Sequence, residues 1–158
     1  MAANTKINLS VQVLETGSEG LGGVKTAPHL WQAVAEWATG TSANQADKVY
    51  ADVVSLAASS SALDLYGVLA DEFGTTINGA ELVLVAVKNN STTSTENITV
   101  TSTIAWISGN IVVGPGGFVV WASPIDGVAI TNSSADTITL NPGSDTFTAD
   151  VLVLMRSA

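Results

Sequence analysis

Few residues of this chain could carry acid–base, nucleophilic or metal chemistry. The 158 residues include one histidine, His29, five lysines and arginines, and no cysteine. Histidine is the side chain that ordinarily changes charge near neutral pH, but a single one next to Pro28 is more often structural or exposed than catalytic. Zinc has no plausible ligand set without cysteine or a second histidine. We therefore predict no metal site and no cofactor.

Pairs of carboxylates are the remaining catalytic option, because a glycosidase needs only two of them. Aspartates at strand ends and turns are, however, favoured there because they hydrogen-bond to the local backbone. We interpret the candidates as solvated turn residues, so we predict that the protein is not an enzyme. Calcium is disfavoured as well, since no spacing resembles an EF-hand loop. The candidate carboxylates are Asp64, Asp71, Glu72, Asp126, Asp136, Asp145 and Asp150.

The charge balance argues against polyanionic partners. The net charge is −9, and the basic residues are scattered along the chain. Binding to phosphates needs clustered lysine or arginine. We predict that the protein binds neither nucleic acid nor anionic lipid. The basic residues are Lys6, Lys25, Lys48, Lys88 and Arg156.

The chain is apolar and weakly charged for a protein of its size. Hydrophobic residues make up 46% of it, charged residues 12%, and the mean hydropathy is +0.37. The charged fraction is about half the usual one, and a free monomer needs charge to stay soluble. Two interpretations have equal weight: much of the surface is buried against other chains, or threonine, serine and asparagine replace charge on the surface.

No segment predicts a membrane span or a secretory signal. Met1–Ser10 lacks a basic stretch followed by an apolar run, which a signal peptide needs. The longest apolar runs are far too short to cross a bilayer. They are Leu82–Val87, Phe118–Ala122 and Val151–Met155.

Most of the chain reads as short strands separated by turns. A chain of this length forms about one domain and can bury a core. Regularly spaced short strands predict an all-β, antiparallel β-sandwich, most simply a jelly roll. The predicted strands are Lys48–Ala58, Ala62–Ala70, Glu81–Lys88, Asn97–Ile104, Phe118–Ala122, Gly127–Thr131, Asp136–Leu140 and Phe147–Met155.

The N-terminal part, residues 1–45, is predicted to be an arm or extension of a sandwich core at residues 46–158. Thr5–Val13 alternates apolar and polar residues, which predicts a half-buried strand, and Thr16–Thr26 is glycine-rich and predicts a loop. The apolar residues of Pro28–Ala38 fit both the repeat of a helix and the alternation of a strand. The segment suits a helix capped by Thr26 and equally one face of a strand, and we favour the helix.

Two strands are candidates for contact between copies. Glu81–Lys88 holds six consecutive apolar residues, which predicts burial on both faces, one toward the core and one toward a neighbouring copy. Phe147–Met155 is the second candidate strand. Tryptophans anchor interfaces or, when exposed, stack on sugars. The interface candidates are Leu82, Leu84, Val85, Val87, Val151, Val153, Trp31 and Trp37.

Three stretches together resemble a group of tailed-bacteriophage virion proteins. They are Gly40-Thr41 with Asn44-Gln45-Ala46-Asp47-Lys48-Val49-Tyr50, Asp64–Gly74 (DLYGVLADEFG) and Gly114–Pro124 (GPGGFVVWASP). The group consists of small β-rich proteins encoded among the head and tail structural genes, some of them similar to jelly-roll cement or decoration proteins. The resemblance covers roughly Gly40 to Met155.

The resemblance implies a structural role on a virion assembled in the host cytoplasm. The expected partners are further copies of the same chain, with a trimer favoured, and the major capsid protein, whose lattice a decoration protein would stabilise. The alternative is a tail-tip or fibre module that binds host-surface carbohydrate through exposed tryptophan.

Overall fold

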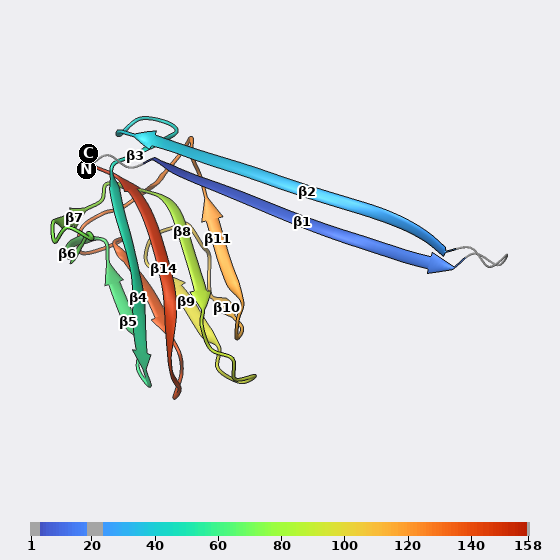
Figure 1. Ribbon diagram of the computed structural model, residues 1–158. Coiled ribbons are helices and arrows are strands. Elements are labelled where there is room, and N and C mark those ends of the chain that lie inside the picture. The colour runs from blue at the N-terminus through green and yellow to red at the C-terminus, as the bar shows by residue number, and fades with distance from the viewer. Residues whose placement is uncertain (1–3, 19–23, 158) are drawn as a thin grey trace.

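The computed structural model describes residues 4–18 and 24–157, and every regular element in these ranges is a β-strand (Figure 1). The predicted all-β class is confirmed. The strands are β1 (Thr5–Ser18), β2 (Val24–Thr39), β3 (Gln45–Ala46), β4 (Lys48–Ala57), β5 (Ser61–Asp64), β6 (Tyr66–Ala70), β7 (Thr76–Asn78), β8 (Glu81–Asn89), β9 (Ile98–Ser102), β10 (Ile111–Val113), β11 (Phe118–Ala122), β12 (Val128–Ala129), β13 (Thr137–Asn141) and β14 (Thr146–Arg156).

Two antiparallel sheets form the sandwich. One has the strand order β10-β9-β13-β5, and the other has the order β11-β8-β14-β4, with β12 also paired to β8. Nearly every strand predicted between residues 48 and 155 is present, although the predicted strand Ala62–Ala70 is divided into β5 and β6. The antiparallel sandwich is thereby established, and the jelly-roll form stays a prediction.

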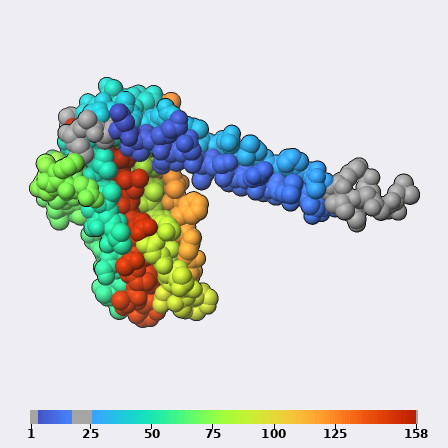
Figure 2. Space-filling model, in the orientation of Figure 1, coloured from blue at the N-terminus to red at the C-terminus, as the bar shows by residue number. Residues whose placement is uncertain are grey.

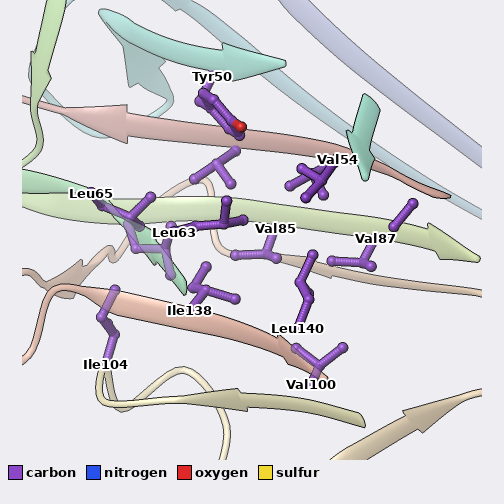
Figure 3. Close-up of a cluster of buried hydrophobic side chains, with 14 of the residues drawn as sticks. Tyr50, Val54, Leu63, Leu65, Val85, Val87, Val100, Ile104, Ile138 and Leu140 are labelled. Carbon is purple, nitrogen blue, oxygen red and sulfur yellow. The ribbon is translucent and has the colours of Figure 1, made fainter. Parts of the chain in front are cut away.

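The main core lies between the two sheets, as the close-up in Figure 3 shows. Alternation within each strand supplies it: Ile98, Val100 and Ile104 point inward with 0% exposure, as predicted. The facing sheet contributes Val85 and Val87 from β8. Each fully buried aliphatic side chain contributes about 1.5–3 kcal/mol through removal from water, so this layer holds the sandwich together.

The N-terminal segment is a long hairpin that leaves the sandwich. Strand β1 pairs along its whole length with β2, from Thr5 opposite Trp37 to Ser18 opposite Val24. At about 3.3 Å per residue, 14 residues make an arm roughly 45 Å long. Figure 1 shows it running away from the sandwich, crosswise to the sandwich strands. The arm joins the rest of the chain through β3, which pairs in parallel with the end of β2.

The prediction of a helix at Pro28–Ala38 is wrong, because this segment lies within β2. The apolar residues of the segment fit both periods, but β1 offers a complete ladder of backbone partners that an isolated helix would leave unused. The loop predicted at Thr16–Thr26 is also shorter than expected, since residues 16–18 and 24–26 are strand. Its remaining residues, 19–23, lie outside the described part of the chain.

A buried arginine fixes the root of the arm to the sandwich. Arg156, at the end of β14, is 5% exposed. Its Nη1 donates to Glu81 Oε2 at 2.8 Å, and its Nε donates to the carbonyl of Gln45 in β3 at 3.1 Å. Its Nη2 donates to the carbonyls of Pro124 at 2.9 Å and Ile125 at 3.1 Å. The planar guanidinium thus joins β14, β8, β3 and the turn after β11.

We expect Arg156→Lys to lower the free energy of unfolding by about 2 kcal/mol, because an ammonium cannot reproduce four hydrogen bonds of fixed fork geometry. Urea unfolding at pH 7 and constant protein concentration measures this. Lys48→Gln is the control, since it removes an ion pair with Asp47 in which Lys48 is 34% exposed, and such pairs contribute about 0–1 kcal/mol. Equal stability of the lysine variant and the wild type would contradict the assigned role of Arg156.

The carboxylate of Asp47 holds the last described residue beside β3. Its Oδ1 accepts from the backbone N–H of Ser157 at 2.7 Å and its Oδ2 from the Ser157 hydroxyl at 2.6 Å. Burial alone would raise the pKa of Asp47, but these hydrogen bonds, together with the charge of Lys48, outweigh it and hold the pKa below its usual value. The ionised form therefore stabilises the fold.

A lowered folded-state pKa fixes the direction of the pH dependence at Asp47. The stabilisation is complete above the unfolded pKa of about 3.9 and is lost as pH falls through the lower folded pKa. Asp47→Asn should therefore cost about 1 kcal/mol at pH 7, and the difference from wild type should shrink below about pH 4. Urea unfolding from pH 7 to pH 3 measures it, with Glu72→Gln, at an exposed carboxylate, as the control for loss of one charge. A difference that stays constant with pH would contradict this account.

Candidate interaction surface

The carboxylates singled out in the sequence serve mainly as local turn acceptors. Asp64 Oδ1 accepts from the N–H of Tyr66 at 2.9 Å. Asp71 Oδ1 accepts from the N–H groups of Phe73 and Thr75, both at 2.9 Å. Asp136, which is 7% exposed, accepts from Thr137 Oγ1 at 2.9 Å. The bonds of Asp64 and Asp71 agree with the interpretation as turn residues. Asp136, in contrast, is buried and not solvated, and Asp150 lies within β14.

One hollow gathers acidic side chains. Asp52, Asp71 and Glu72 line a concavity of about 290 Å³ beside Tyr50. The Tyr50 hydroxyl donates to Asp52 Oδ2 at 3.2 Å, and burial, reinforced by the Asp52 charge, raises the pKa of Tyr50 to about 12. Within residues 4–18 and 24–157, no group of three or more histidine, aspartate or glutamate side chains is placed to hold a metal ion. His29 lies on the arm with Nε2 at 3.5 Å from Glu15 Oε2, and both side chains are well exposed.

Most of the predicted interface residues are buried inside their own chain. The prediction that they contact a second copy is therefore wrong, because none is more than 3% exposed. The opposite sheet covers five of them, and the other two are buried where the arm root, which includes Trp37, meets the outer face of the sheet. They are Leu82, Val85, Val87, Val151 and Val153 in the main core, and Leu84 and Trp37 in a second cluster.

The second cluster lies on the outer face of the sheet β11-β8-β14-β4, under the root of the arm. Its buried members include Val83 and Leu84 of β8, and Ile7 and Ala35 of the arm pack against them. The strand β8 is buried on both faces, as predicted, only in its first half, since Ala86 is half-buried and Lys88 is exposed. The second face is covered by the chain's own arm rather than by a neighbour. The full cluster is Trp37, Ala46, Val83, Leu84 and Leu154, with Ile7, Ala35, Val49 and Leu152 packed against it.

All four tryptophans lie in the described residues, and Trp31 alone is largely exposed, at 56%. Trp37 and Trp106 are 2% and 6% exposed. Trp121 is half-buried against the main core, with its ring centroid 5.9 Å from that of Trp106. Burial of Trp106 excludes a sugar-binding surface built on this residue. Among the interface candidates, Trp31 alone is exposed enough to contact a partner.

The exposed part of the arm carries an apolar face. Alternation places Leu9, Val11 and Val13 of β1 on the same face as Trp31 and Ala33 of β2. We call these five residues the arm stripe. Val11, Val13 and Trp31 are 48%, 53% and 56% exposed, so the half-burial predicted for this strand is limited to its root. The opposite face mixes Val34, Leu30 and Leu14 with Asn8, Ser10, Gln12 and Gln32.

A second apolar surface continues the sheet face beyond the arm root. We call it the sheet patch: Ala51, Val53, Ala86, Phe118, Val120 and Leu152. Phe118, Val53 and Val120 are 61%, 60% and 36% exposed. Figure 2 shows this face of β4, β14, β8 and β11, with the arm crossing only its upper end. The sequence analysis missed this patch, although Phe118–Ala122 is apolar at every position and so had to present one apolar face outward.

The sheet patch contains a shallow hollow of about 270 Å³. Ala86, Phe118, Val120 and Leu152 line it, together with residues of the Lys88–Asp150 pair, whose Nζ and Oδ2 atoms are 3.6 Å apart. At about 30 Å³ per water, the hollow has room for a bulky side chain. The arrangement can bind an apolar group beside Val120, Ala86 and Leu152. The charged pair lies in the neighbouring row of the sheet, between Phe118 and Val53.

Comparison with protein-family models, with curated proteins and with solved structures finds no match to this chain. The functional argument therefore depends on the geometry of the arm and the sandwich. No helix in the described ranges is long and apolar enough to cross a membrane.

Two substitutions at Trp37 test the packing of the arm root. Trp37→Ala should lower the free energy of unfolding by about 3–5 kcal/mol, because it empties the centre of the second cluster. Trp37→Phe should cost less than about 1 kcal/mol, because the indole Nε1 is buried with no hydrogen-bond partner among the described residues, and removing such a donor offsets the lost contacts. Chemical unfolding measures both. A cost of Trp37→Phe as large as that of Trp37→Ala would contradict this account, because it would mean that a phenyl ring does not restore the packing of the cluster.

Proposed function

We propose that this protein is a structural virion protein of a tailed bacteriophage, a capsid decoration or cement protein that self-associates and binds the major capsid protein lattice. The observation that carries the proposal is the exposed apolar arm. A two-stranded hairpin is marginally stable by itself in water, and contiguous exposed apolar surface marks interaction sites. An arm with Val11, Val13 and Trp31 each about half exposed is therefore suited to an assembled particle.

The mechanism is adhesion by many modest contacts. Each copy presents the arm stripe and the sheet patch on a rigid sandwich, and joining several copies makes later contacts intramolecular, which multiplies the affinity for a repeating lattice. Only 12% of residues are charged, which leaves most of the surface free for uncharged contacts, and these contacts outweigh the mutual repulsion of a net charge of −9 per copy. The resemblance of Asp64–Gly74 and Gly114–Pro124 to phage virion proteins supports the capsid as the lattice.

The alternative is a tail-tip or fibre module that binds host carbohydrate. Trp31 is the observation that favours it, since exposed indole rings stack on sugars. Trp31 lies opposite Val11 and next to Leu9 and Ala33. The exposed His29–Glu15 pair lies farther along the same face, so the immediate neighbours of the ring are mostly aliphatic. We therefore prefer the role of interface anchor for Trp31.

Electron cryo-microscopy of the parent virion tests the proposed function. We expect a β-sandwich with a projecting arm at repeated positions on the capsid surface, and we expect particles from a gene deletion to lose this density and to release DNA at lower temperature. Density confined to the tail tip would favour the carbohydrate-binding alternative. Absence of the protein from purified particles would refute both.

Self-association can be measured on the purified protein. Native mass spectrometry and sedimentation at micromolar concentration should give a single oligomer, with a trimer expected. A clean monomer over this range would contradict the self-associating part of the proposal.

A further inference from the structure

We propose that the arm stripe of one copy packs on the sheet patch of the next copy, so that copies join head to tail. This inference rests on the proposed self-association and specifies the surfaces that carry it. The occupant of the sheet patch is then a second copy of this chain, contributing Trp31, Val11 and their neighbours. Three observations support this pairing.

The first observation is that the contact already exists within one chain. At the arm root, Ile7, Ala35 and Trp37 pack on Leu84 and Leu154 of the outer sheet face. The stripe continues the same face of the hairpin by alternation, and the patch continues the same face of the sheet, with Leu152 opposite Ala86 and Ala86 opposite Val120. The arm face and the sheet face that pack together at the arm root therefore both continue, uncovered, beyond the root.

The second observation is the direction of the arm. Figures 1 and 2 show the arm crossing only the upper end of its own sheet and then leaving the sandwich. The described part of the arm therefore leaves the patch of its own chain uncovered, and Phe118 and Val53 keep 61% and 60% exposure. The patch is therefore free to receive the arm of another copy.

The third observation is the match of shape and chemistry. The stripe presents one bulky ring, Trp31, among the smaller side chains Ala33 and Val11. The patch presents one apolar hollow, lined by Phe118, Val120 and Leu152. An aromatic anchor in a desolvated pocket is the usual energetic centre of a protein interface.

The symmetry of the proposed assembly follows from the separation of the arm stripe from the sheet patch. Because the stripe and the patch do not overlap, each copy can give one arm and receive another, which is a heterologous contact. Such contacts close into a ring or continue as a filament. A closed ring covers every stripe and every patch, which agrees with the expected trimer.

Cysteine cross-linking tests the contact directly, since the natural sequence has no cysteine. Val11→Cys on the stripe and Val120→Cys on the patch are prepared as separate single variants. A mixture of the two should form disulfide-linked dimers on mild oxidation, whereas either variant alone should not. Ser10→Cys, on the opposite face of the arm, and Val112→Cys, on the other sheet, are matched controls that should not link to the partner positions. Dimers of Val11→Cys alone would indicate arm-to-arm packing and would overturn the proposal.

Charge insertion measures the strength of the contact. Trp31→Asp and Phe118→Asp should each raise the dissociation constant of the oligomer by about 30-fold or more, as loss of an interface anchor does. Leu30→Asp, equally exposed at 61% but on the other face of the arm, should leave it within about threefold. An equal mixture of the two disrupted variants should give a dimer, because one intact arm meets one intact patch. Circular dichroism checks that each variant is folded.

The outcomes separate this inference from the proposed function. If wild-type protein forms oligomers but neither aspartate variant weakens them, the head-to-tail contact is wrong and self-association stands. If the wild type is monomeric and binds through its arm only to capsids, the receiver is the major capsid protein and the inference is again wrong. If the cross-links form as expected but purified virions lack the protein, the contact stands and the virion role is refuted.

Discussion

The structure depends on a sheet that is apolar on both faces. The inner face of β11-β8-β14-β4 meets the second sheet and forms the main core. The outer face begins with Leu84 and Leu154, both fully buried, and needs cover of its own because exposed apolar area is unfavourable in water. The arm root supplies that cover at one end of the face. The root of the arm is therefore part of the packing of the sandwich. The rest of the arm projects away from the sandwich.

The polar groups of the protein are used mostly to hold this arrangement in place. Arg156 satisfies carbonyls of β3 and of the turn after β11 while it pairs with Glu81. Asp47 holds Ser157 beside the same root, and Asp64 and Asp71 close local turns. Arg156, Asp47, Asp64 and Asp71 thus fix the local shape of the chain.

The sandwich and the distal part of the arm differ in how much apolar surface they bury. The sandwich has a closed core, whereas the distal arm has backbone hydrogen bonds between two strands but little burial, since Val13, Leu14 and Leu30 are 53%, 62% and 61% exposed. Elements of this kind have low local stability and gain order when a partner covers them.

The sequence by itself determined the β class, nearly all of the sandwich strands and the inward positions Ile98, Val100 and Ile104, because strand periodicity is a local property of the backbone. Alternation also placed Ile7, Leu9, Val11 and Val13 on one face. It could not decide Pro28–Ala38, whose residues fit a helix and a strand equally until β1 provided a partner. It could not show that Leu84 is covered by the chain's own arm while Phe118 is left exposed. The hydrophobic effect has no direction, so the pattern shows that a residue needs cover, and only the tertiary structure decides what provides it.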